Sequence, residues 1–145
     1  MLFDVRYCSM DAYFSVKEVD LAIVADLGTL QRLPFIVGYG NTMELALTGR
    51  KLSAIEAKSI GLVNNVFTSK EAMEEYVISL AGNIASKSPL TVVGIKKVLI
   101  KSRDLSIHDG LDYVATWNSA MLDSNDLKKA MEASMQKSKP SLSKL

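Results

Sequence analysis

The chain has 145 residues, of which 48% are hydrophobic and 23% charged, which suits a single globular domain with its own core. Its 17 Lys and Arg nearly balance its 16 Asp and Glu, and the charges are scattered, which argues against a nucleic-acid-binding surface. A single cysteine, Cys8, excludes an internal disulfide, and a single histidine, His108, leaves no Cys/His metal cluster. No apolar stretch approaches the roughly 20 residues of a membrane span. We therefore expect a soluble, intracellular protein without a structural metal.

The first 16 residues predict two short strands. Residues 2–8 and 12–16 are rich in aromatic and β-branched side chains, and a polar segment separates them. Two strands alone make a marginal sheet, whereas an α/β layer needs a larger one. The sequence thus begins as though within a fold, and we expect the chain to be part of a larger domain.

From about residue 41 the sequence predicts helices. Ser53 and Glu56 form a capping box, in which each side chain accepts a hydrogen bond from the other residue's backbone N–H. A strand-like segment, residues 62–67, follows that short helix. Four further helices are expected, each beginning at a polar residue: Thr68, Ser88, Ser106 and Asp123.

The last residues of the chain predict a targeting signal. Its last three residues, Ser143, Lys144 and Leu145, read S-K-L, the peroxisomal tripeptide that an import receptor recognises. The preceding residues are polar, which favours an exposed tail. We expect peroxisomal import, with the import receptor as a partner; the alternative is a chance occurrence of the tripeptide.

Three acids, Glu18, Asp20 and Asp26, lie in an otherwise largely apolar stretch, residues 16–34. The segment that Glu18 and Asp26 flank, residues 19–25, is expected to pack against the core, and burial would raise the pKa of an unpaired carboxyl toward neutrality. Glu18 and Asp26, eight residues apart, are therefore candidate proton carriers.

The same acids have structural explanations, which the spacing alone favours. Asp20 can be solvated, and Asp26 can cap a helix that begins near Gly28. Three cations are available to neutralise Glu18: Arg6, Lys17 and Arg32.

Two segments carry a resemblance to a known family. Residues 6–34, RYCSMDAYFSVKEVDLAIVADLGTLQRLP, and residues 43–67, MELALTGRKLSAIEAKSIGLVNNVF, resemble the crotonase (enoyl-CoA hydratase/isomerase) superfamily, and within it the Δ3,5-Δ2,4-dienoyl-CoA isomerases. The resemblance implies the α/β crotonase fold, with residues 1–145 as the C-terminal portion of one domain. Within it, about 1–40 would hold core strands and an active-site turn, about 41–136 helices, and 137–145 the tail.

The resemblance also implies a reaction on an acyl-CoA thioester in fatty acid β-oxidation, without a metal or redox cofactor. The acids at Glu18 and Asp26 match the family's proton-transfer pair, which moves a proton between C2 and C6 of a 3,5-dienoyl-CoA. Hydratases of the superfamily usually carry a small residue in place of Asp26, so this residue favours the isomerase. The alternatives are a 2-enoyl-CoA hydratase and a catalytically silent fragment that acts only in assembly.

Two further features of the family bear on this chain. The backbone N–H groups that stabilise the thioester enolate are expected upstream of Asp4, so the chain alone is expected to be a poor catalyst. Crotonases assemble as trimers or hexamers, so a homo-oligomer is expected. Tyr113, Trp117 and Met121 share one helix face, which predicts either core packing or a subunit interface.

Overall fold

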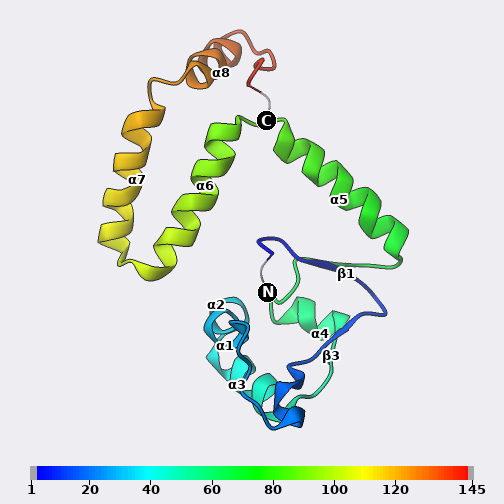
Figure 1. Ribbon diagram of the computed structural model, residues 1–145. Coiled ribbons are helices and arrows are strands. Elements are labelled where there is room, and N and C mark those ends of the chain that lie inside the picture. Colours follow the sequence, from blue (N-terminus) through cyan, green and yellow to red (C-terminus); the bar gives the residue numbers. More distant parts are fainter. Residues whose placement is uncertain (1–2, 144–145) are drawn as a thin grey trace. The chain divides into compact units, whose positions relative to one another are not determined.

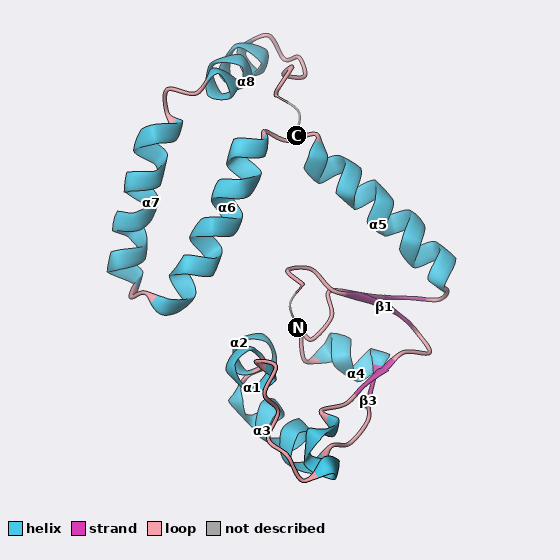
Figure 2. Ribbon diagram, in the orientation of Figure 1, coloured by secondary structure: helices cyan, strands magenta, loops and turns pink. Residues whose placement is uncertain are grey.

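The computed structural model, in which residues 3–143 are described, has two compact units, Met1–Val77 and Ile78–Leu145 (Figure 1). The first unit combines short strands with short helices, and the second is helical (Figure 2). Helix α5 (Lys70–Ala85) belongs in part to each unit.

Four short strands of the first unit form two separate pairs. They are β1 (Tyr7–Ser9), β2 (Tyr13–Phe14), β3 (Leu52–Ser53) and β4 (Asn65–Phe67). β1 runs parallel to β4, with Cys8 opposite Val66, and β2 runs antiparallel to β3, with Phe14 opposite Leu52. The two predicted N-terminal strands are therefore confirmed, although shorter than expected, while β3 was not predicted.

The helical elements of this unit begin and end at residues that suit those positions. They are the 3₁₀ helix η1 (Lys17–Leu21), α1 (Thr29–Arg32), α2 (Pro34–Val37), α3 (Tyr39–Thr48) and α4 (Ala54–Ser59). Gly49 ends α3 with a φ of 60°, a left-handed conformation that glycine adopts without strain. Ser53 caps α4, as predicted, by accepting a hydrogen bond from the backbone N–H of Glu56 at 3.3 Å.

A small apolar core joins these elements. Leu33 and Leu52 are the largest fully buried side chains, and residues from the strands, α3 and α4 surround them. Cys8 is buried in this core, where burial, and secondarily the charge of Asp11, raises the pKa of its thiol. Its thiol is therefore a neutral core group.

Arg50 connects the end of α3 to α4. Its guanidinium donates to Glu44 at 2.6 Å and to both carboxylate oxygens of Glu56, at 2.5 and 3.0 Å. This charge-assisted pairing raises the pKa of Arg50 and lowers that of Glu56.

The second unit is built on three helices, α6 (Pro89–Lys101), α7 (Ile107–Met121) and α8 (Asn125–Met135), with the 3₁₀ turn η2 (Ser102–Asp104) between the first two. α6 and α7 lie side by side and antiparallel (Figure 1). Their contact joins Gly94 of α6 to Trp117 of α7, whose ring also lies 6.3 Å from that of Tyr113. Trp117 therefore packs against α6 within this unit, while all three side chains of the predicted face remain partly exposed.

Two predicted helix starts were wrong by one residue. Ser69, not Thr68, caps α5 by accepting from the N–H of Ala72 at 3.1 Å. Ser124, not Asp123, caps α8 by accepting from the N–H of Leu127, because Asp123 is exposed and pairs with Lys128 at 2.9 Å. In both cases the serine oxygen is the one that reaches the free N–H groups of the first turn.

Within residues 3–143, no helix is long and apolar enough to cross a membrane, and no group of three or more His, Cys, Asp or Glu side chains could hold a metal ion.

Candidate active site

Glu18 lies on η1, directly after the short strand β2. The buried side chain of Val16 precedes the helix, and Ala22 ends it with a φ of 56°. The N–H of Ile23 donates to the backbone oxygen of Glu18 at 3.2 Å, which closes the turn. This short helix leaves the Glu18 side chain half-buried at the wall of a pocket.

The pocket has a volume of about 790 Å³ and lies within the first unit. Its walls are mostly apolar and aromatic, and Glu18 is the only acid among the described residues that line it. The lining also includes Tyr7, Tyr13 and Phe14, which sequence reasoning did not single out for the site; their place in two aromatic strands was the available signal. An apolar wall with one acid suits an apolar ligand that exchanges a proton.

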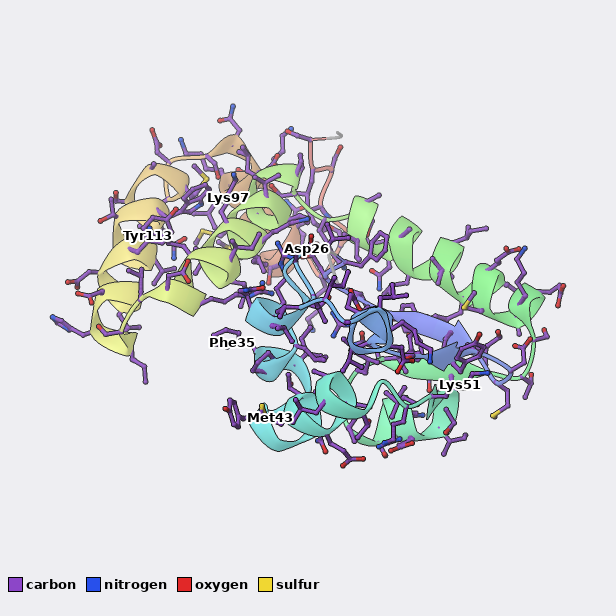
Figure 3. The ribbon with its side chains drawn as sticks, turned by 60° about the horizontal axis from the view of Figure 1, so that its bottom comes forward. Asp26, Phe35, Met43, Lys51, Lys97 and Tyr113 are labelled. Carbon is purple, nitrogen blue, oxygen red and sulfur yellow. The ribbon has the colours of Figure 1, made fainter. Side chains whose placement is uncertain are left out.

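Asp26 lies on the loop between η1 and α1 and is exposed (Figure 3). Gly28 begins α1 with a φ of 81°, and no side chain caps that helix, so the predicted capping role of Asp26 is not observed. Arg32 turns back to this loop, where its guanidinium donates to the backbone oxygens of Leu27 at 3.0 Å and Gly28 at 3.4 Å.

Across residues 3–143, neither the Glu18 nor the Asp26 carboxylate takes part in a side-chain hydrogen bond or ion pair. The three cations expected as partners of Glu18 are engaged elsewhere. Arg6 donates to the backbone oxygen of Leu62 at 2.6 Å, Lys17 pairs with Asp20 at 2.5 Å, and Arg32 binds the loop after Asp26. Both candidate proton carriers are therefore left without an ion-pair partner in the part of the chain that the structure describes.

Asp20 differs from the other two acids. It forms its ion pair with Lys17 along η1, rather than being only solvated as one alternative held. Its carboxylate also lies beside Gly49, where an added Cβ would come within 3.2 Å of Oδ1. Asp20 thus lies where η1 meets the end of α3.

The expectation that residues 18–26 pack into the core was wrong. Ala25 is buried, but the larger apolar side chains around it are exposed: Val19, Leu21, Ile23, Val24 and Leu27. A five-residue 3₁₀ helix followed by a loop cannot turn all of these side chains to one face, because it has no sustained period that would gather them. The apolar character of this stretch is therefore not a sign of burial in the described residues.

The sequence signature of the enoyl-CoA hydratase/isomerase family matches residues 1–144. The peroxisomal Delta(3,5)-Delta(2,4)-dienoyl-CoA isomerase of Arabidopsis thaliana is 63% identical to this chain over 142 residues, which cover 98% of this chain and 51% of that protein. The mitochondrial Delta(3,5)-Delta(2,4)-dienoyl-CoA isomerase of Rattus norvegicus is 50% identical, over 92% of this chain and 41% of its own length.

A solved structure, the enoyl-CoA hydratase of Bacillus anthracis, matches with a TM-score of 0.91 at 32% identity, over 96% of this chain and 54% of that one. The chain spans about half the length of the relatives that it matches. The match nevertheless covers nearly all of this chain, so its fold is part of a crotonase domain. The chain belongs to the enoyl-CoA hydratase/isomerase (crotonase) family.

Proposed function

We propose that this chain carries the proton-transfer pair of an isomerase that converts 3,5-dienoyl-CoA to 2,4-dienoyl-CoA in the β-oxidation of unsaturated fatty acids. One observation carries the proposal: among the described residues, Glu18 and Asp26 are the two acids of the η1–α1 region without an ion pair, in a chain 63% identical to a dienoyl-CoA isomerase. Proton transfer at carbon requires a positioned carboxyl group that can take up and release a proton.

The reaction needs two acids at separate positions. In a 3,5-dienoyl thioester the carbonyl acidifies C2, and one carboxylate removes a proton there to leave a dienolate. The electron pair shifts along the chain, so the double bonds come to lie at C2=C3 and C4=C5, and the other carboxyl group delivers a proton at C6. Atoms and charge balance without a redox step, since one proton leaves C2 and one arrives at C6.

The positions of the two acids fit this division. Glu18 lies at the wall of the apolar pocket, which suits contact with an acyl chain, and Asp26 lies on the exposed loop that follows. A hydratase instead needs two acids that converge on one water molecule. Two acids at separate positions, one at the pocket wall and one on the following loop, therefore favour isomerisation.

The test is a set of three carboxamide substitutions, Glu18→Gln, Asp26→Asn and Asp20→Asn, assayed by the absorbance of the conjugated 2,4-diene. Each variant is made in this chain and in a chimera that places it after the upstream part of the Arabidopsis relative. In the chimera we expect Glu18→Gln and Asp26→Asn to lower turnover by about 10²–10⁴-fold, the usual contribution of a general acid or base. Asp20→Asn is the matched control and is expected to retain most of the activity, because Asp20 is paired with Lys17.

Full diene formation by either Glu18→Gln or Asp26→Asn in the chimera would overturn the assignment. Loss of the enoyl absorbance on incubation with a 2-enoyl-CoA, without diene formation from a 3,5-dienoyl-CoA, would identify a hydratase instead, the activity named for the Bacillus anthracis structure.

The isolated chain is expected to turn over far more slowly than the chimera. On the family resemblance we expect the N–H donors to the thioester oxygen upstream of Asp4, and removing even one such donor typically costs about 10²–10³-fold in rate. Equal turnover by the isolated chain and the chimera would refute this expectation.

We propose that the protein acts in the peroxisome, through recognition of Ser143, Lys144 and Leu145 by the import receptor. The Arabidopsis relative is named peroxisomal, whereas the rat relative is named mitochondrial. Lys144 and Leu145 lie outside the described residues. A fluorescent protein fused ahead of the chain should enter peroxisomes and should remain outside them when these three residues are deleted; import of the deleted form would refute the address.

We further propose that the chain assembles as a trimer or hexamer. Three exposed apolar residues, Tyr39, Met43 and Leu47, recur every fourth residue along α3, and Met43 points outward in Figure 3. Sedimentation of the chimera should give the mass of a trimer or a multiple of it, and a monomer would contradict the proposal.

The silent-fragment alternative predicts co-assembly of this chain with the full-length relative but no added isomerase activity.

A further inference from the structure

The C-terminal segment is held by a buried carboxylate at the start of α8. Asp126, the second residue of that helix, is 5% exposed. Its Oδ1 accepts two hydrogen bonds from Ser143, one from the backbone N–H at 3.0 Å and one from the hydroxyl at 2.9 Å. The contact spans 17 residues of sequence, so it is a specific closure of the tail onto the helix.

The same segment also contributes an apolar contact. Leu142 is half-buried and lines a pocket of about 550 Å³ in the second unit, together with residues of α6, α7 and α8. Ser88 and Asp126 lie at this pocket, and both are more than nine-tenths buried. The tail therefore docks by one apolar side chain and by two hydrogen bonds to a charged acceptor.

The electrostatics favour the docked state. The nearby Ser88 hydroxyl, and next the N–H of Ser143, lower the pKa of Asp126, so its carboxylate is charged at neutral pH. Ser88 Oγ and Asp126 Oδ2 have no hydrogen-bond partner within the described residues. The buried Asp126 carboxylate thus accepts two hydrogen bonds, both from Ser143. Hydrogen bonds to a charged acceptor are stronger than hydrogen bonds between neutral groups.

We propose that this pocket is a docking site for the chain's own C-terminal segment, and that docking competes with the receptor that reads the terminal Ser-Lys-Leu. The N–H and hydroxyl of Ser143, the first residue of that tripeptide, are the donors that Asp126 holds. A receptor can engage Ser143 fully only after Asp126 releases it. The competition rests on the peroxisomal address proposed above, whereas the docking itself does not.

Competition between docking and the receptor would change the apparent dissociation constant for the receptor. When only a fraction of molecules has a free tail, the apparent dissociation constant for a tail-binding receptor rises by the inverse of that fraction. If one molecule in about ten has a free tail, the intact chain binds about tenfold more weakly than a free peptide of the same sequence.

The experiment compares receptor binding by the intact chain, by Asp126→Ala and by a synthetic peptide of residues 137–145, using the purified tripeptide-binding domain of the receptor. Asp126→Ala should bind about tenfold more tightly than the unchanged chain, close to the peptide. Asp123→Ala is the matched control, because Asp123 precedes the same helix but is exposed and pairs with Lys128. It should bind like the unchanged chain.

A second variant covers the case in which Asp126→Ala weakens α8, which circular dichroism would reveal. Leu142→Ser removes the apolar anchor from the tail side and leaves α8 intact, and the same change in the peptide corrects for direct effects on the receptor. Hydrogen exchange at the amide of Ser143 reports docking without the receptor and should be faster in Asp126→Ala and Leu142→Ser than in Asp123→Ala.

The outcomes separate the two claims. Equal receptor binding by the unchanged chain, both undocking variants and the peptide would overturn the competition. Unchanged amide exchange at Ser143 in both variants would overturn the docking. If the peptide itself fails to bind the receptor, the peroxisomal address fails and the competition with it, while accelerated exchange at Ser143 would still support the docking site.

Discussion

Replacement of Gly94 by alanine tests how α6 and α7 pack. Gly94 is buried within α6, facing Trp117 of α7. A Cβ at this position would lie 2.7 Å from the indole Nε1 and 3.3 Å from Cε2. Both atoms belong to a rigid ring, so the ring or the helix has to move to admit a methyl group.

Two opposing effects set the magnitude. Alanine is favoured over glycine within a helix by about 1 kcal/mol. Adding a methyl group to a packed contact typically costs about 1–3 kcal/mol. The clash at 2.7 Å is severe, so we expect the cost to exceed the gain by about 1 kcal/mol, which lowers the melting temperature of a unit of this size by about 4–8 °C.

The assay is thermal unfolding followed by circular dichroism and by the fluorescence of Trp117, the single tryptophan of the chain. Gly82→Ala is the matched control, because a Cβ at Gly82 in α5 meets nothing within 4 Å, and this variant should be stabilised by up to about 1 kcal/mol. In a Trp117→Phe background, which removes Nε1, Gly94→Ala should lose its penalty. A gain in stability from Gly94→Ala equal to that from Gly82→Ala would refute the packing argument.

Three further predictions concern the first unit, each measured by urea unfolding. Leu52→Ala should destabilise it by about 2–5 kcal/mol, because Leu52 is fully buried; a loss well below this range would mean that the core collapses around the gap. Arg50→Lys should lower the midpoint modestly, because lysine cannot reproduce the two bonds to Glu56, and an unchanged midpoint would show that this pair is dispensable. The folded-state pKa of Glu56 lies below its ordinary value of 4.5, so its contribution is complete above that pH and is lost as the pH falls through the lowered pKa. Arg50→Gln should remove that part of the acid sensitivity, and an identical pH profile would contradict the assignment.

Helix starts were largely predictable because they depend on contacts three residues apart. The caps at Ser53 and Ser106 are those that the sequence indicated, and Ser106 accepts from the N–H of Asp109 at 3.1 Å. The wrong starts, at Thr68 and Asp123, each missed a serine one residue further on. Where two adjacent residues can both cap a helix, the sequence does not show which of them is the N-cap. The geometry of the first helical turn decides between them.

Strand pairing was less predictable because its partners are distant in sequence. β3 has only two residues and pairs with β2, about 40 positions earlier, supported by the Ser15 hydroxyl, which donates to the backbone oxygen of Gly49 at 2.6 Å. Nothing in a two-residue segment identifies it as a strand. The expectation that residues 18–26 pack into the core was wrong for a similar reason. Local hydrophobicity does not show whether a distant part of the chain covers a given side chain.

The candidate site was located by family resemblance, and the structure adds a physical reason for choosing among its three acids. A 3₁₀ helix has three residues per turn, so Lys17 and Asp20 eclipse each other on one face of η1. Their 2.5 Å ion pair lies on that face, whereas Glu18 lies on another face and lines the pocket. Among the described residues, Glu18 is thus left without an ion pair at the pocket wall, where a carboxyl group can exchange a proton with a bound substrate.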